Sequence, residues 1–223
     1  EKQRERLSNM LSIRDDFIKN VDDSHVYIAS GNKKPGIIPS VSLMPIIDCP
    51  NSAICQDQCY DFRTDCMRPG CVKNRALNSA ILRIDRDRYF SEIKKAASLY
   101  TYFRWHIGGD IVDIDYSDRM CKIANELTAC TFLVFTKCYS IVNTYVDQGY
   151  KIPENLIVVF SNWVGVDINN KYNFPTSHPL FPDGSTTAHN GAKYCSGNCT
   201  ECALDNNGCW NMKRGDEVIF PLH

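Results

Sequence analysis

The chain has 223 residues, of which 43% are hydrophobic and 11% aromatic, enough to bury the core of one large domain. Its formal net charge of −1 argues against the broad basic surface of a dedicated duplex-DNA-binding protein. No run approaches the roughly 18 apolar residues of a membrane-spanning helix, and residues 1–6 are charged where a signal peptide would be apolar. We therefore expect a cytoplasmic protein with no membrane partner.

The expected secondary structure alternates between helices and strands. Apolar side chains recur at a helical period in residues 3–21. Residues 25–29 then favour a short strand, residues 31–36 break it with glycine and proline, and residues 37–47 form an extended segment. Later helices are expected at residues 72–82, 89–99, 116–127 and 140–148, and later strands at residues 100–107, 130–136, 155–161 and 217–220. This order predicts βα units and a mainly parallel α/β sheet.

We expect the whole chain to form a single domain. An N-terminal helical segment (1–24) precedes a βα core (25–161), which includes a first cysteine-rich loop at residues 48–71. In the last part, 162–223, prolines are frequent and aliphatic side chains are few until residue 190. There we expect irregular structure over the end of the sheet, followed by more cysteines and a closing strand.

Twelve cysteines are the most informative residues of the chain. A chain of this size without an export signal does not need disulfide staples, which favours metal binding. Two sets of closely spaced thiols have the character of ligands, because thiolates suit zinc, copper(I) and iron–sulfur clusters. We name Cys49, Cys55 and Cys59 the first cysteine group, and Cys195, Cys199, Cys202 and Cys209 the second cysteine group.

The spacing of these thiols favours an iron–sulfur cluster over zinc. Structural zinc modules usually offer two C-x2-C pairs, whereas Cys199 and Cys202 form the only such pair in the two groups. Irregular spacing on long loops suits a polynuclear centre, so we expect a [4Fe–4S] cluster, with zinc as the alternative. The first group would hold a cluster with an open iron, a three-iron cluster, or part of a cluster shared with the second group.

The spacing Cys195-x3-Cys199-x2-Cys202 is similar to the signature of radical S-adenosylmethionine enzymes. An open iron in such a cluster would admit S-adenosylmethionine as a cofactor. The chain departs from that pattern because the motif lies near the C-terminus instead of after the first strand. It also departs because Cys209 is available to fill the fourth iron position.

The remaining cysteines differ in kind. Cys121 and Cys130 lie among apolar neighbours and are interpreted as small buried hydrophobic residues. Cys66 and Cys71 flank a Met-Arg-Pro-Gly segment and are interpreted as exposed loop thiols. Cys138 follows a predicted strand closely enough to face a site, but we assign it no role.

Polar side chains follow three consecutive predicted strands, at the C-terminal ends where βα proteins place their chemistry. Glycines at the first of these ends would let a ligand approach the backbone. A half-buried structural histidine, a helix-capping aspartate and a solvated lysine are the alternative interpretations. We expect catalytic or substrate-placing roles for His106, Asp110 and Lys137, and cofactor-binding roles for Gly108, Gly109 and Asn162.

The order of these motifs resembles the phage gene product 88 family, from about residue 40 to the C-terminus. That family is similar to radical S-adenosylmethionine enzymes in its core, and the resemblance implies a partial or distorted TIM-type barrel, a cluster and, for a viral protein, residence in the host cytoplasm. It implies no particular reaction. The motifs that carry the resemblance are Ser42-Leu43, Cys49-Pro50, Cys59-Tyr60, Arg75, Asn78, Arg104-x-His106-x2-Gly109-Asp110, Thr136-Lys137, Cys195/Cys199/Cys202/Cys209-Trp210, Phe220 and His223.

Our leading hypothesis is an iron–sulfur protein which, if its cluster has an open iron, acts on a small molecule or nucleotide as a redox or radical enzyme. Electron transfer to a redox partner is a third interpretation. The alternative is a non-catalytic module in which zinc or a closed cluster staples loops that bind nucleic acid or a protein. Basic side chains between Arg63 and Arg88, with Tyr60 and Phe62 for stacking, favour this alternative, and the interspersed aspartates weaken it.

Overall fold

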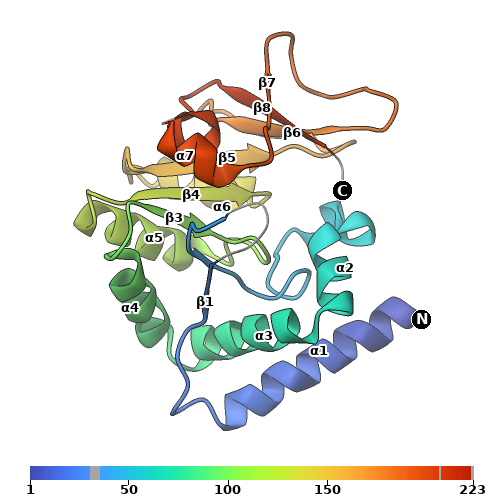
Figure 1. The fold of residues 1–223 in the computed structure, drawn as a ribbon, viewed down its shortest axis with the longest axis vertical. Helices are drawn as coiled ribbons and strands as arrows, with labels where there is room; N and C mark the ends of the chain where they lie inside the picture. The colour runs from blue at the N-terminus through green and yellow to red at the C-terminus, as the bar shows by residue number, and fades with distance from the viewer. Residues whose placement is uncertain (31–35, 206, 222–223) are drawn as a thin grey trace.

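The structure is a computed structural model that describes residues 1–30, 36–205 and 207–221. The described residues form one eight-stranded sheet flanked by helices (Figure 1). The expected break at residues 31–36 lies almost wholly outside the described residues, as does His223.

The sheet has the strand order β1-β2-β3-β4-β5-β6-β8-β7. Neighbouring strands run parallel, except that β1 is antiparallel to β2. The mainly parallel α/β sheet predicted from the sequence is therefore confirmed. The strands are β1 (Ile28–Ala29), β2 (Ser40–Val41), β3 (Tyr102–Trp105), β4 (Thr131–Thr136), β5 (Leu156–Ser161), β6 (Thr176–Leu180), β7 (Lys193–Tyr194) and β8 (Glu217–Pro221).

Capping residues account for where several helices begin. The Asp85 carboxylate accepts a hydrogen bond from the Arg88 N–H at the start of α4, and the Asp113 carboxylate does the same for Tyr116 at the start of α5. Pro69 occupies the first turn of α3, where its missing N–H costs nothing. The helices are α1 (Lys2–Lys19), α2 (Tyr60–Met67), α3 (Pro69–Ile84), α4 (Arg86–Ala97), α5 (Ile114–Glu126), α6 (Tyr139–Asp147) and α7 (Cys199–Leu204), with 3-10 turns η1 (Ser52–Ile54), η2 (Gln56–Gln58) and η3 (Gly208–Asn211).

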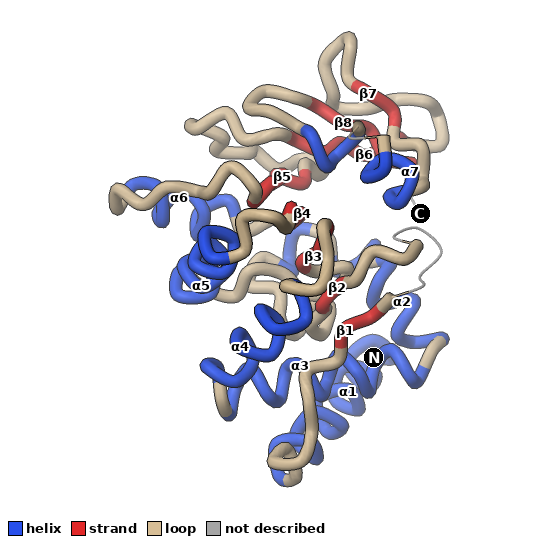
Figure 2. The backbone as a smooth tube through the Cα atoms, turned by 60° about the vertical axis from the view of Figure 1, so that its left-hand side comes forward, coloured by secondary structure: helices blue, strands red, loops and turns tan. Residues whose placement is uncertain are grey.

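Side chains that alternate along the central strands build two separate cores. On β4, Phe132 and Val134 are buried in the larger core with residues of α3, α4, α5 and α6. Leu133, on the opposite face, packs in a smaller core with Ala203 of α7 and Trp210 of η3. Figure 2 shows α5 and α6 on one side of the central strands and α7 on the other.

The sheet is wound as in a barrel but does not close. From β2 to β6 each strand is added on the same side of the one before, which keeps α5 and α6 on a single face, as right-handed crossovers require. The two edge strands, β1 and β7, have two residues each and leave the sheet open. A TIM-type barrel is thus not confirmed, and α7 covers the face that would be the interior of a barrel.

The prediction of irregular structure for residues 162–190 was wrong for residues 176–180. Thr176–Leu180 forms β6, which lies between β5 and β8. The composition of β6 does not predict a strand, because proline is unusual inside a sheet. Pro179 lies beyond the last β5 pair, Ser161 with Ser177, so only β8 runs beside it.

Candidate functional site

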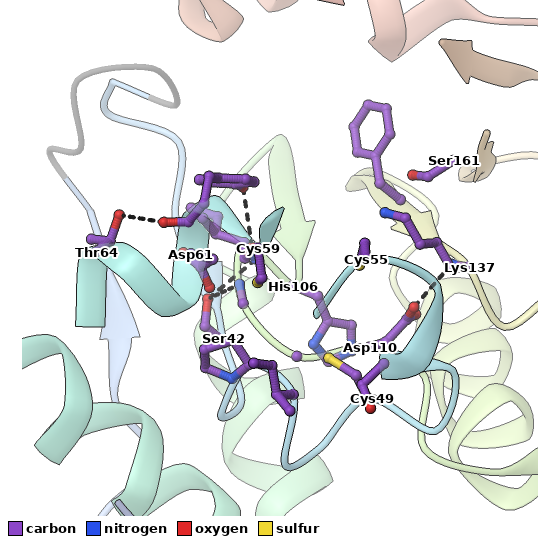
Figure 3. Close-up of a pocket in the computed structure, with 18 of the residues that line it drawn as sticks. Ser42, Cys49, Cys55, Cys59, Asp61, Thr64, His106, Asp110, Lys137 and Ser161 are labelled. Carbon is purple, nitrogen blue, oxygen red and sulfur yellow. Dashed lines mark hydrogen bonds between the residues drawn. The ribbon is translucent and has the colours of Figure 1, made fainter. Parts of the chain in front are cut away.

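A cavity of about 560 Å³ lies at the C-terminal ends of β3, β4 and β5 (Figure 3). Parallel strands bring the residues that follow them to one edge of the sheet, and the loop that carries the first cysteine group reaches the same edge. The structure therefore brings together residues that are far apart in the sequence. The predicted residues that line the cavity are His106, Gly108, Gly109, Asp110, Lys137, Asn162, Cys49, Cys55 and Cys59.

Asp110 ties the loop after β3 to the end of β4. Its buried carboxylate accepts hydrogen bonds from the Thr136 hydroxyl at 2.6 Å, from the Lys137 N–H at 2.9 Å and from the Ile111 N–H at 2.7 Å. Burial raises the pKa of this carboxyl, and the three hydrogen bonds oppose the increase. Asp110 thus holds the cavity wall in place with groups of the protein itself.

His106 is buried at the cavity with its ring nitrogens unused. Neither nitrogen has a hydrogen-bond partner within the described part of the chain, and the side chain is 3% exposed. Burial lowers its pKa to about 3, with a further contribution from Arg104, against the opposing effect of the Gly108 backbone. The imidazole is therefore neutral at physiological pH, and its ring nitrogens are available to hydrogen-bond a ligand.

The backbone is strained on both sides of the cavity. His106 has φ of 54° and Ile46, which also lines the cavity, has φ of 67°. Left-handed φ is costly for residues other than glycine, and it persists where the surrounding structure enforces it, often at functional sites. His106 is held in this conformation by its own N–H, which donates to the Val41 carbonyl at 2.9 Å, and by packing of its ring near Tyr116.

A buried ion triad of Arg75, Asp61 and Asp65 forms part of the cavity wall, which Arg75 and Asp61 line directly. The Arg75 guanidinium donates to Asp61 at 2.8 Å and to Asp65 at 2.5 Å. Burial raises the pKa of both carboxyls, that of Asp65 to about 7, and Arg75 opposes the increase. A Cβ atom on Gly108 would lie 2.0 Å from Asp61 Oδ2, so this position must be glycine for the triad and the loop to pack together.

The first cysteine group faces the cavity from the 3-10 turns and the start of α2. Cys59 Sγ caps α2 by accepting a hydrogen bond from the Phe62 N–H at 3.4 Å. Burial raises the pKa of the Cys49 thiol, and Asp110, Cys59 and Cys55 add to the increase. The three thiols are therefore close enough to influence one another, and each is free and partly buried.

The second cysteine group gathers on the opposite face of the sheet, against the smaller core. Cys199 and Cys202 stand on α7, and Gly208 approaches Cys202 so closely that a Cβ there would lie 2.8 Å from its Sγ. Burial raises the pKa of the Cys209 thiol to about 12, and Cys195, Cys199 and Cys202 are among the further causes. The four thiols thus share one partly buried environment.

The two cysteine groups do not lie in one site. The first lines the main cavity, whereas Cys195, Cys202 and Cys209 line a second cavity of about 550 Å³. Among the described residues, no group of three or more His, Cys, Asp or Glu side chains is arranged to hold a metal ion. The expectation of one cluster shared by both groups finds no support in this arrangement.

Arg104 lies between the two regions. It lines the main cavity, and its Nη1 is 4.0 Å from Cys199 Sγ of the second group. From the sequence, Arg104 was named only within a family motif. Side chains alternate along β3, so Arg104 lies on the same face as Tyr102 and on the opposite face from Phe103. This alternation is the signal in the sequence that indicates its position.

His178 is a second cavity residue that the sequence analysis missed. Its Nδ1 lies 2.9 Å from the Thr187 hydroxyl, and its Nε2 lies 3.0 Å from the Thr176 hydroxyl and 3.7 Å from a Glu217 carboxylate oxygen. Burial lowers its pKa, although Glu217 opposes this. His178 was missed because the segment that carries it was expected to be irregular.

The other cysteines divide into confirmed and corrected cases. Cys121 and Cys130 are buried in the larger core, as predicted, and Cys138 is buried in the same core at the other end of β4, next to Asp110. Cys66 and Cys71 are not loop thiols, because they lie in α2 and α3. Cys71 also lines the main cavity.

The basic side chains that favoured a nucleic-acid-binding module are largely paired. Arg75 and Arg83 bind buried aspartates, and Arg86 and Arg88 bind Asp113, Asp115 and Glu92. Paired charges contribute little to an open cationic surface. In the described part of the chain, no helix combines the length and apolar character needed to cross a bilayer.

The comparison with protein families gives one match. Residues 19–179 match the family described as Gene product 88. The match begins before residue 40 and ends before the second cysteine group, which corrects the expected coverage at both ends. Radical S-adenosylmethionine enzymes gain no support as relatives, and neither the curated proteins nor the solved structures include a significant match. Because the match covers more than half of the chain, the protein belongs to the phage Gene product 88 family.

Proposed function

We propose that this protein binds an iron–sulfur cluster at the second cysteine group and uses the main cavity to bind a small-molecule substrate. The observation that carries the proposal is the gathering of four partly buried thiols against one apolar core. Ionised thiols so placed repel one another, and a metal centre removes that repulsion by taking the thiolates as ligands.

The surroundings of the four thiols fit an anionic cluster. The Gly197 N–H donates to Cys195 Sγ at 3.4 Å, and the Ser196 hydroxyl lies 3.4 Å from Cys202 Sγ. The Arg104 guanidinium adds a positive charge beside Cys199. Hydrogen bonds and charges of this kind tune the reduction potential of a cluster. A cluster held by Cys195, Cys199, Cys202 and Cys209 would supply or accept one electron at a time.

The cavity residues suit the handling of a substrate near such a centre. Neutral His106 offers its ring nitrogens to a hydrogen bond from a substrate, Asp110 fixes the loop that carries it, and Lys137 offers a cation to a substrate group. The first cysteine group would supply three thiolates to a second metal centre and leave one coordination position open toward the cavity. S-adenosylmethionine is one molecule that such a position would accept.

The test is purification of the full chain without oxygen, followed by measurement of iron, acid-labile sulfide, zinc and visible absorption. The proposal expects a coloured protein with iron and sulfide in equal amounts. A colourless protein loaded with zinc, or a protein with no metal, would overturn it.

Electron paramagnetic resonance of the reduced protein tests the role of the first group. A cluster with an open iron changes its spectrum when S-adenosylmethionine is added. An unchanged spectrum would exclude direct binding of this cofactor and leave the cluster of the second group as the only redox centre proposed.

A further inference from the structure

Two cations on the wall of the main cavity rest on aromatic rings. Lys137 Nζ lies 5.6 Å from the centroid of the Trp163 ring, and Arg104 Cζ lies 5.1 Å from that of Phe135. All four side chains line the cavity. A cation–π contact holds a charged group in position without cancelling its charge.

Neither cation has a carboxylate partner. Within the described ranges, no Asp or Glu lies at ion-pair distance from Lys137 or Arg104, and the buried Arg104 Nε has no hydrogen-bond partner. Arg75, which also lines the cavity, is instead bound by Asp61 and Asp65. Lys137 and Arg104 are therefore not ion-paired, and they act on Asp110 and Asp61 only at longer range.

The carboxylates of the cavity are already engaged. Asp61 is paired with Arg75, and Asp110 accepts its three hydrogen bonds from backbone and hydroxyl groups. Cations without an ion-pair partner in a concave site attract anionic ligands. Charge-assisted hydrogen bonds from lysine and arginine are also stronger than neutral ones.

We propose that the main cavity binds a small molecule that carries a carboxylate or phosphate group, and that Lys137 and Arg104 hold this group. The aromatic rings of Trp163 and Phe135 beside the two cations favour a planar, unsaturated part in the same molecule. The cavity volume of about 560 Å³ lies in the range of drug-sized ligand sites. The inference gives the substrate class of the proposed function and rests on it for the role of the ligand as a substrate.

Binding is measured by titration calorimetry on the full chain, whose iron content is determined beforehand. Adenosine monophosphate and benzoate serve as phosphate and carboxylate probes, and adenosine and benzamide are their neutral counterparts. At least one anionic probe is expected to bind at least about 10-fold more tightly than its neutral counterpart. The anionic probe with the larger gain over its neutral counterpart shows whether the site prefers a phosphate or a carboxylate. Added salt is expected to weaken that binding.

Variants locate the anion. Lys137→Gln is expected to weaken binding of the anionic probe at least about 10-fold, whereas Lys137→Arg restores affinity to within about 3-fold. Lys171→Gln is the matched control, because Lys171 also lies over a ring, that of Tyr172 at 5.2 Å, but outside the cavity. Equal affinity of charged and neutral probes, no binding of either anion, or full binding by Lys137→Gln would overturn the inference. Anion binding by a protein without iron would support it while overturning the proposed cluster.

Discussion

The two cysteine groups use the same side chain in opposite settings. Around the first group, the protein supplies its own polar framework, which includes the Asp110 hydrogen bonds and the Arg75 ion triad. In the second, Cys199 and Cys202 lie in a six-residue helix, Cys209 lies in a 3-10 turn, and Cys195 follows a two-residue strand. Short elements of this kind gain stability from a crosslink. Under the proposed function, the first region receives a ligand and a metal centre holds the second together.

The largest expected effect is the difference between removing one thiol from the second group and removing one from the first. Cys202→Ser is expected to abolish iron binding at the second group and to lower the thermal unfolding midpoint by roughly 10 °C, because metal binding contributes several kcal/mol to folding. Cys59→Ser should shift the midpoint by no more than about 3 °C, since serine is itself a good helix N-cap for α2. Calorimetry and iron analysis of both variants provide the measurement. Equal shifts in the two variants would remove the distinction between the regions.

An intermediate effect tests the polar framework of the cavity. Gly108→Ala would place a methyl group 2.0 Å from Asp61 Oδ2 and 2.9 Å from Arg75 Cζ. We expect a loss of about 3 kcal/mol in unfolding free energy from overpacking and disruption of the buried ion pairs. Gly70→Ala, which meets nothing within 4 Å, is the control and should change stability by less than about 1 kcal/mol. Similar urea midpoints for both variants would contradict this account.

The smallest effect concerns the pH dependence of stability. The folded-state pKa of His106 is about 3, below its ordinary value, so its contribution to stability is complete above about pH 6.5 and is lost as the pH falls. Each pH unit below 6.5 costs about 1.4 kcal/mol. Between pH 6.5 and 5 the unmodified protein should therefore lose about 2 kcal/mol more than His106→Asn, a variant that tolerates the left-handed φ. If urea unfolding shows that both proteins lose stability equally over this pH range, folding does not lower the pKa of His106.

Local pattern predicted the centre of the sheet well. The apolar runs at residues 130–136 and 155–161 became β4 and β5, the helical period before β4 became α5, and the one between the two strands became α6. These elements were predictable because burial on both faces of a parallel strand requires continuous apolar residues. Strand order then brought His106, Asp110 and Lys137 to one cavity.

What escaped prediction depends on contacts between distant segments. The polar strand β6 is stabilised by β5 and β8 and not by its own composition. Barrel closure depends on the two edge strands, whose short length no local pattern reveals. The separation of the cysteine groups follows from the fold of residues 193–212 onto the opposite sheet face, which spacing alone does not encode.

Arg104 gives the molecule a property that neither region has alone. One guanidinium borders both the ligand cavity and the sulfur atom of Cys199, so any occupant that draws it toward the cavity alters the charge felt on the other side of the sheet. With the proposed cluster in place, thermodynamic linkage would require the converse: the state of the cluster would change the affinity of the cavity by the same factor. Under that proposal, a single side chain would make ligand occupancy and electron content depend on each other.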